Sequence, residues 1–143
     1  MELPFIHMSP EEFRERFVSE EQCLRFLAEK KWGDTYVCKK CGNTNYCKGK
    51  HPYSRRCTRC KHDESAKVGT LFEGCRFPLE KAFYIAFLVC NAHNISSYEI
   101  SRELQLRQMT CWSFKKKLQE CILAHPHINT KRKIDLEKIV LQS

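Results

Sequence analysis

Two pairs of cysteines constrain the fold of this 143-residue chain more than any other feature of its sequence. Cys38 and Cys41 form one Cys-x-x-Cys pair, Cys57 and Cys60 form the second, and fifteen residues separate the two pairs. This spacing is typical of a four-cysteine zinc ribbon, because each pair turns two thiolates toward one ion and the intervening loop is long enough for a β-hairpin. Four sulfurs fill the tetrahedron and leave no position for water, so the sequence predicts a structural Zn²⁺ site and not a catalytic one.

Other interpretations of these cysteines stay open at this stage. The pairs are also compatible with redox chemistry or with unligated buried thiols, and iron is an alternative metal. Cys47, His51 and His62 lie close enough in sequence to replace one ligand. The other five cysteines lie among apolar residues and are expected to be small core side chains: Cys23, Cys75, Cys90, Cys111 and Cys121.

Neither the first ten residues nor the longest apolar run of the sequence reads as an export signal or a membrane span. Met1 to Pro10 lacks a basic stretch followed by an apolar one, and the apolar run from Ala82 to Cys90 is about half as long as a bilayer requires. We therefore expect a cytoplasmic protein without a membrane partner. Thiols stay reduced in that compartment, which favours metal binding over disulfides.

Positive charge is concentrated in two blocks of the sequence. The formal net charge is +8, and residues 30–67 contribute +8 and residues 107–133 contribute +6, while residues 1–29 contribute −4. Such blocks attract a polyanion and release its counterions on binding, which favours a nucleic-acid partner. A basic surface that only aids solubility is the alternative.

The helical segments flank the cysteine region. Ser9 and Ser19 each begin a capping-box sequence, which predicts two short N-terminal helices. Turn-forming and β-branched residues dominate residues 32–77, which predicts short strands. Apolar residues then recur at helical spacing over 78–93, over a short segment that Ser96 or Ser97 can cap, and over 108–124.

These elements predict a small α+β protein: a four-cysteine zinc ribbon of short antiparallel strands, flanked by N-terminal helices and a C-terminal trihelical helix-turn-helix. We divide the chain into N-terminal helices (1–32), zinc ribbon (33–77), helix-turn-helix (78–126) and basic tail (127–143). Two groups of side chains are candidates for DNA contact, with Trp112 expected to pack at the border of the core. The first group lies on the ribbon hairpin: Lys48, Lys50, Tyr53, Arg55 and Arg56. The second lies on the last helix: Arg107, Gln108, Ser113, Lys116 and Lys117.

The order of the motifs resembles the N-terminal region of bacterial insertion-sequence transposases of the zinc-ribbon, DDE type. The resemblance covers roughly residues 9–122 and rests on separate motifs: Phe13, Cys23-Leu24, Trp32-Gly33, Cys38-x-x-Cys41-Gly42, Arg56-Cys57-x-x-Cys60, Gly69-Thr70-x-Phe72, Pro78-Leu79, Ile95-Ser96-Ser97, Leu104 and Thr110-Cys111-Trp112. It implies that ribbon and helix-turn-helix bind the terminal repeats of a mobile element, and that an RNase H-like domain cuts and joins DNA during recombination.

This sequence departs from the family at that catalytic domain. Its three aspartates, Asp34, Asp63 and Asp135, are scattered, whereas two-metal phosphoryl transfer needs clustered carboxylates. We therefore expect a DNA-binding protein that is not an enzyme, with double-stranded DNA, a full-length transposase or a second copy of itself as partner. The alternatives are a stand-alone transcriptional regulator and a zinc-ribbon adaptor that contacts a protein through Phe13 and Phe17.

Overall fold

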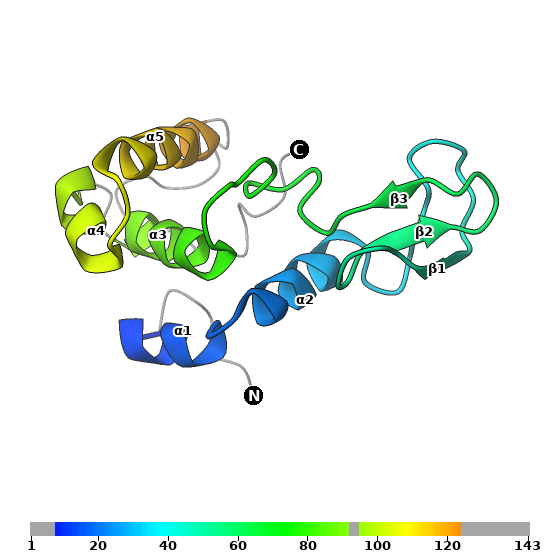
Figure 1. Ribbon diagram of the computed structural model, residues 1–143, viewed down its shortest axis with the longest axis horizontal. Helices are drawn as coiled ribbons and strands as arrows, with labels where there is room; N and C mark the ends of the chain where they lie inside the picture. The colour runs from blue at the N-terminus through cyan, green and yellow to red at the C-terminus, as the bar shows by residue number, and fades with distance from the viewer. Residues whose placement is uncertain (1–7, 92–94, 124–143) are drawn as a thin grey trace.

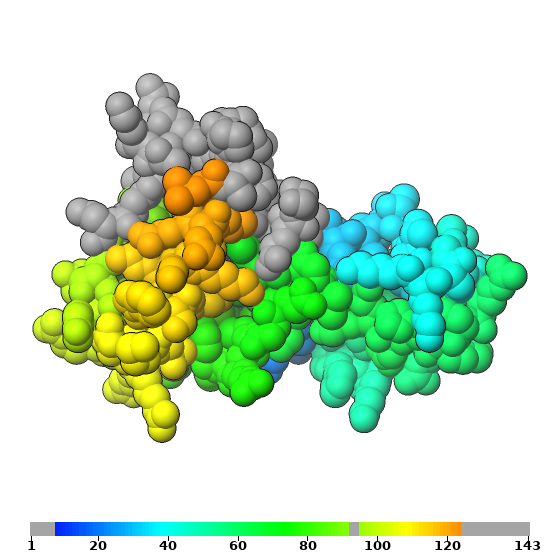
Figure 2. Space-filling model, turned by 90° about the horizontal axis from the view of Figure 1, so that it is seen from above, coloured from blue at the N-terminus to red at the C-terminus, as the bar shows by residue number. Residues whose placement is uncertain are grey.

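The arrangement of helices and strands follows the predicted order. The computed structural model describes residues 8–91 and 95–123, and a three-stranded antiparallel sheet lies at one end of its long axis, with α4 and α5 at the other (Figures 1 and 2). The small α+β class is confirmed. The elements are α1 (Pro10–Arg16), α2 (Glu20–Lys31), β1 (Tyr46–Lys48), β2 (Arg55–Cys57), β3 (Asp63–Glu64), α3 (Leu79–Asn91), α4 (Ser97–Leu104) and α5 (Gln108–Leu123).

Capping interactions fix where the first two helices begin. The Ser9 Oγ accepts the backbone N–H of Glu12 at 3.2 Å, and the Glu12 carboxylate accepts the N–H of Ser9 at 3.3 Å. This is the predicted capping box, with Pro10 at the first helical position. At α2 the side-chain oxygen of Gln22 accepts the N–H of Ser19 at 3.0 Å.

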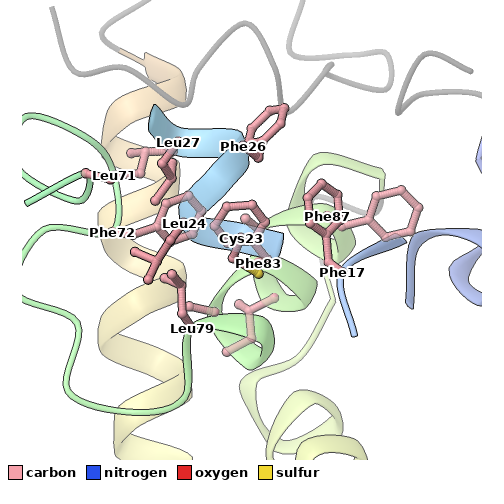
Figure 3. Close-up of a cluster of buried hydrophobic side chains, with 14 of the residues drawn as sticks. Phe17, Cys23, Leu24, Phe26, Leu27, Leu71, Phe72, Leu79, Phe83 and Phe87 are labelled. Atoms are coloured by element: carbon pink, nitrogen blue, oxygen red, sulfur yellow. The ribbon is translucent and has the colours of Figure 1, made fainter. Parts of the chain in front are cut away.

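Aromatic side chains hold the helices together in one hydrophobic core (Figure 3). Phe13 of α1 stacks on Phe87 of α3 with ring centroids 4.4 Å apart. Phe72, from the segment after the ribbon, stacks on Phe83 at the same distance. Both Phe13 and Phe17 are buried. The hypothesis that these two residues contact a protein partner is therefore wrong, because they already pack inside this chain.

We refer to residues 79–123 as the three-helix unit. Helix α3 is buried along almost its whole length, as its apolar sequence predicted, and both α2 and α5 pack against it. Ser96 accepts the N–H of Tyr98 and begins α4, and Gln105 ends α4 in a left-handed conformation with φ of 56°. The buried face of α5 carries Cys111, Phe114, Leu118 and Ile122. None of the described helices is long and apolar enough to cross a membrane.

A buried ion pair attaches the ribbon to α2. The Lys31 Nζ lies 2.8 Å from the Glu64 carboxylate of β3 and also donates to the carbonyl oxygens of Ser65 and Val68. All three ammonium protons of Lys31 therefore have partners within the protein. One core includes residues from both the helices and the ribbon. The proposed boundaries at 32, 77 and 126 stay predictions, and the tail 127–143 lies outside the residues that the structure describes.

Candidate metal centre and nucleic-acid surface

The two cysteine knuckles have the same backbone turn. In the first, the N–H of Gly42 donates to the carbonyl oxygen of Cys38 at 2.9 Å, and Gly42 has a φ of 77°. In the second, the N–H of Lys61 donates to the carbonyl oxygen of Cys57 at 3.1 Å, and Lys61 has a φ of 66°. Each turn needs a left-handed residue directly after its second cysteine, which is easy for glycine and costly for lysine. The repeated geometry directs both pairs of sulfurs toward one point.

The four sulfurs lie at distances that suit a shared ion. The Sγ atoms of Cys38, Cys41, Cys57 and Cys60 all lie within 4.8 Å of one another. The Cys38–Cys60 and Cys41–Cys57 separations are 3.6 and 3.5 Å, far longer than a disulfide bond. A tetrahedral zinc ion with sulfur ligands at about 2.3 Å places its sulfurs about 3.8 Å apart. The residues therefore fit Zn²⁺ in its structural, four-sulfur form.

Hydrogen-bond donors stabilise thiolates at this centre. Cys57 Sγ accepts from the backbone N–H groups of Arg59 and Cys60 and from the side-chain amide of Asn43, at 3.3 to 3.4 Å. Burial opposes ionisation, but these donors prevail and lower the pKa of Cys57 from 9.0 to about 5. At Cys38 burial likewise opposes ionisation, and backbone N–H groups, including that of Lys40, lower its pKa.

Ionising all four sulfurs requires a cation between them. The N–H of His62 favours the thiolate of Cys60, but burial and the three neighbouring cysteines raise the pKa of Cys60 to about 11. A dication removes this repulsion. The buried Tyr36 hydroxyl lies beside the Cys38 sulfur. Burial first, and then the sulfurs of Cys38 and Cys57, raise the pKa of Tyr36 to about 12, so the hydroxyl keeps its proton beside the centre. The N–H groups that donate to the sulfurs therefore suit four thiolates bound to zinc.

The remaining cysteines and nearby histidines lie outside this centre. Within residues 8–91 and 95–123, the four-cysteine cluster is the one group of three or more potential ligands close enough to hold a metal ion. Cys47 and His51 are exposed and do not join it, and neither does His62. Burial raises the pKa of Cys23 to about 12, as expected for an inert core thiol. Cys90 and Cys111 are buried, whereas Cys75 and Cys121 are only partly buried.

Three basic residues of the ribbon hairpin reach solvent to different extents. Lys48 on β1 and Lys50 at the hairpin tip are exposed. Arg56 on β2 is half-exposed and forms an ion pair with Asp63 at 3.1 Å. The backbone N–H of Lys50 also donates to Asp63 at 2.8 Å, and these donors, with burial opposing them, lower the pKa of Asp63. Among these three cations, Lys48 and Lys50 therefore have the most solvent access.

Tyr53 and Arg55, also candidates for DNA contact, are engaged within the protein. The Tyr53 hydroxyl donates to Glu21 on α2 at 3.3 Å. The Arg55 guanidinium lies between the rings of Trp32 and Tyr46, 4.8 and 4.2 Å from their centroids, and donates to the carbonyl oxygen of Gly33. These contacts join the hairpin to the end of α2. Tyr53 and Arg55 therefore stabilise the packing of the ribbon against α2.

On α5 the candidate residues separate into exposed and engaged groups. Arg107, just before the helix, and Ser113 and Lys116 along it are exposed. Gln108 is half-buried, and its side-chain amide donates to Ser97 on α4 at 2.8 Å. Lys117 is half-buried and donates to the carbonyl oxygen of Glu73 at 3.2 Å. Ser113 and Lys116 are therefore open to solvent along α5, with Arg107 exposed just before it, and the engaged set joins α5 to its neighbours.

The prediction that Trp112 packs at the border of the core is wrong. Its side chain is 46% exposed, and the Lys116 ammonium lies 5.2 Å from the centroid of its ring. Position 112 lies one residue beyond the buried Cys111, and a helix turns far enough in that step to carry a side chain out of the core. Met109, three residues earlier on α5, is exposed as well.

Sequence reasoning did not single out Arg76. This exposed residue lies in the segment before α3 and lines a groove of about 420 Å³ together with Ser113, Phe114 and Lys117 of α5. Arg76 is isolated in sequence from both basic blocks, so only the folding of residues 73–77 against α5 reveals its proximity. It adds a cation beside the candidate surface of α5.

Comparison with known proteins supports the ribbon directly. Residues 18–63 match the family profile of the transposase zinc-ribbon domain named for IS1595. The match covers about a third of the chain, from the start of α2 through both knuckles to β3. It confirms the predicted resemblance to a transposase zinc ribbon and, with the four convergent sulfurs, the assignment of zinc as the bound metal. No curated protein and no solved structure matches the chain.

Proposed function

We propose that this chain is a DNA-binding protein related to the N-terminal region of insertion-sequence transposases. In this proposal it holds duplex DNA through the zinc ribbon and through the three-helix unit, which acts as a helix-turn-helix. One observation carries it: a segment that matches a transposase zinc ribbon shares its hydrophobic core with a three-helix unit whose last helix exposes Lys116 and directly follows the exposed Arg107.

The geometry of α4 and α5 supports a helix-turn-helix. The left-handed Gln105 turns the chain sharply after α4, and α5 then begins within three residues and packs against both α4 and α3. In DNA-binding proteins of this type the second helix of the pair lies in the major groove, with its first residues nearest the bases. Arg107 directly precedes α5, beside those first residues, and is exposed.

The charges of the two ends support contact with one long duplex. Lys48 and Lys50 are exposed on the ribbon, and Arg107 and Lys116 are exposed beside and on α5, at the opposite end of the molecule (Figure 1). Because the ends are separated by the α2–α3 core, we propose that they contact separate segments of the phosphate backbone. Contacts to phosphate position a protein on DNA without reading its sequence.

We propose a binding role for the chain and no catalytic one. The metal centre is closed by four sulfurs, which leaves no position for a substrate or an activated water. A DNA-binding protein of this kind can occupy the ends of a mobile element and compete there with a full-length transposase. It can equally regulate transcription from a site of its own, and both roles use the same contacts.

Salt dependence of binding to duplex DNA tests the proposal. The full zinc-loaded chain is titrated against a fluorescent duplex at several salt concentrations, and affinity should fall steeply as salt rises, because bound cations displace counterions. Lys116→Ala should lower the affinity and reduce the slope of log affinity against log salt by about 1. Arg25→Ala is the matched control, because it also removes one positive charge but lies on α2, where Arg25 is paired with Glu29 at 3.3 Å.

The result that overturns the proposal is equally specific. No binding in protein that retains zinc would remove duplex DNA as the ligand, and binding that does not change with salt would refute contact between these cations and the phosphates. Equal effects of Lys116→Ala and Arg25→Ala would show that net charge alone matters and that α5 does not contact the backbone. Zinc content and circular dichroism of each variant establish that it is folded.

A further inference from the structure

We propose that Met109 and Trp112 recognise the methyl groups of thymine bases in the major groove. The inference rests on the proposed function and deepens it, because it assigns sequence recognition to two apolar side chains and not to the lysines around them. Met109 is 64% exposed and Trp112 is 46% exposed, although both are large and apolar.

Helical spacing places these residues on one outward stripe. One face of α5 carries Met109, Trp112, Ser113 and Lys116. Trp112 and Ser113 lie three and four residues after Met109, and Lys116 lies four and three residues after them, which is the spacing of neighbours on a helix surface. The buried residues of α5 occupy the opposite face, against α3. Packing within the three-helix unit therefore does not explain why this stripe contains two large apolar side chains.

Charge identifies the partner of this stripe as DNA. A single exposed apolar residue is ordinary on any surface. Here two of them are accompanied by Arg107 at the start of the helix and by Lys116, whose ammonium lies 5.2 Å from the Trp112 ring. Arg107 lies at the N-terminus of α5, where the helix dipole contributes further positive charge. The N-terminal part of this strip, with Arg107 before it and Lys116 one turn after Trp112, complements a groove that has methyl groups on its floor and phosphates on both sides.

The chemistry of the major groove selects thymine among the bases. Thymine presents its C5-methyl group there, the other three bases present only hydrogen-bonding groups and ring edges, and a thioether or indole can bury that methyl without losing a hydrogen bond. Met109 has no proton to donate and no charge. Residues of this kind favour A·T pairs at the positions that they cover, while Arg107 remains available for guanine or phosphate.

Replacing thymine with deoxyuridine tests the inference, because deoxyuridine pairs identically and lacks only the methyl group. The full chain first selects its preferred duplexes from a random-sequence library. Each thymine of a selected duplex is then replaced in turn. We expect one or two positions at which the replacement weakens binding about 4-fold, the effect of exposing one methyl group. With Trp112→Ala or Met109→Ala the same replacement should have no further effect at the corresponding position.

A matched control separates this effect from general loss of surface. Leu123 lies on the same helix and is 73% exposed, but it is at the other end of α5, so Leu123→Ala should leave every thymine-to-deoxyuridine ratio unchanged. Zinc retention and circular dichroism show whether each variant is folded. If either Met109→Ala or Trp112→Ala fails to fold, the other variant still tests the inference.

Three results would overturn the inference, and they are distinguishable from one another. Selected duplexes that bind equally well with deoxyuridine throughout, or binding without any sequence preference, would refute methyl recognition and leave DNA binding intact. Absence of DNA binding altogether would refute the proposed function and the inference with it. Insensitivity to deoxyuridine together with self-association that Trp112→Ala abolishes would assign the stripe to a second copy of the chain.

Discussion

Replacement of Lys31 by alanine tests how the ribbon is held against the helices. The side chain of Lys31 is 9% exposed and that of its partner Glu64 is 4% exposed, with 2.8 Å between the charged groups. Burial is the main cause that lowers the pKa of Lys31, and Glu64 only partly offsets it. The ammonium therefore depends on its three acceptors, and the Glu64 carboxylate depends on the ammonium.

The structure sets the magnitude of the effect. Removing one partner of a buried ion pair costs about 3–5 kcal/mol, because the other charge stays buried without compensation. Lys39 remains 3.7 Å from Glu64, but its side chain is 56% exposed and screened by water, so it offsets little. We expect Lys31→Ala to lower the free energy of unfolding by about 3 kcal/mol. Replacing both partners, as Lys31→Met with Glu64→Leu, should cost only about 1–2 kcal/mol, mainly from the two abandoned carbonyl acceptors.

Urea denaturation at a fixed excess of zinc measures these differences, because ligand binding otherwise shifts apparent stability. Arg25→Ala breaks a solvent-exposed pair with Glu29 and should cost less than about 0.5 kcal/mol. The reasoning is refuted if Lys31→Ala costs no more than Arg25→Ala, or if the double replacement destabilises the protein as much as the single one.

Two further predictions concern the ribbon itself. A methyl group on Gly49 would lie 2.6 Å from Asp63 Oδ1 and 3.0 Å from the Ser54 carbonyl carbon, so Gly49→Ala should destabilise the hairpin by about 1–3 kcal/mol, measured by denaturation against wild type. Zinc should be retained at pH 7 and released in strong acid, measured with a chromogenic chelator, because protons compete with the metal for the four thiolates. In the metal-free chain the fold lowers the pKa of Cys57 from 9.0 to about 5, so the contribution of this thiolate to stability is complete above pH 9 and is lost as pH falls from 9 to 5. Full zinc occupancy at pH 3 would contradict this reasoning.

Local sequence signals predicted much of the fold and of the metal centre. The ribbon follows from the spacing of the cysteine pairs, and the start of α1 follows from a capping box that spans the four residues from Ser9 to Glu12. Such features depend on neighbours along the chain, and that is why a single sequence reveals them. The apolar periodicity of α3 likewise required burial on nearly every face.

Features that depend on distant residues were not predictable in this way. Arg55 belongs to a basic hairpin in the sequence, but its guanidinium lies between two rings, one of which, Trp32, is more than twenty residues away. Lys31 and Glu64 form their pair across the boundary between α2 and the ribbon. Trp112 was misplaced because one helical step separates a buried position from an exposed one.

Elemental analysis of the purified, reduced chain and of its Cys57→Ser variant tests the central claim most directly. We predict one zinc ion per wild-type molecule and loss of both the ion and the ribbon structure in the variant, because structural zinc binding supplies folding free energy. A wild-type chain that is folded without any metal, or a Cys57→Ser chain that remains folded and binds DNA, would contradict the account.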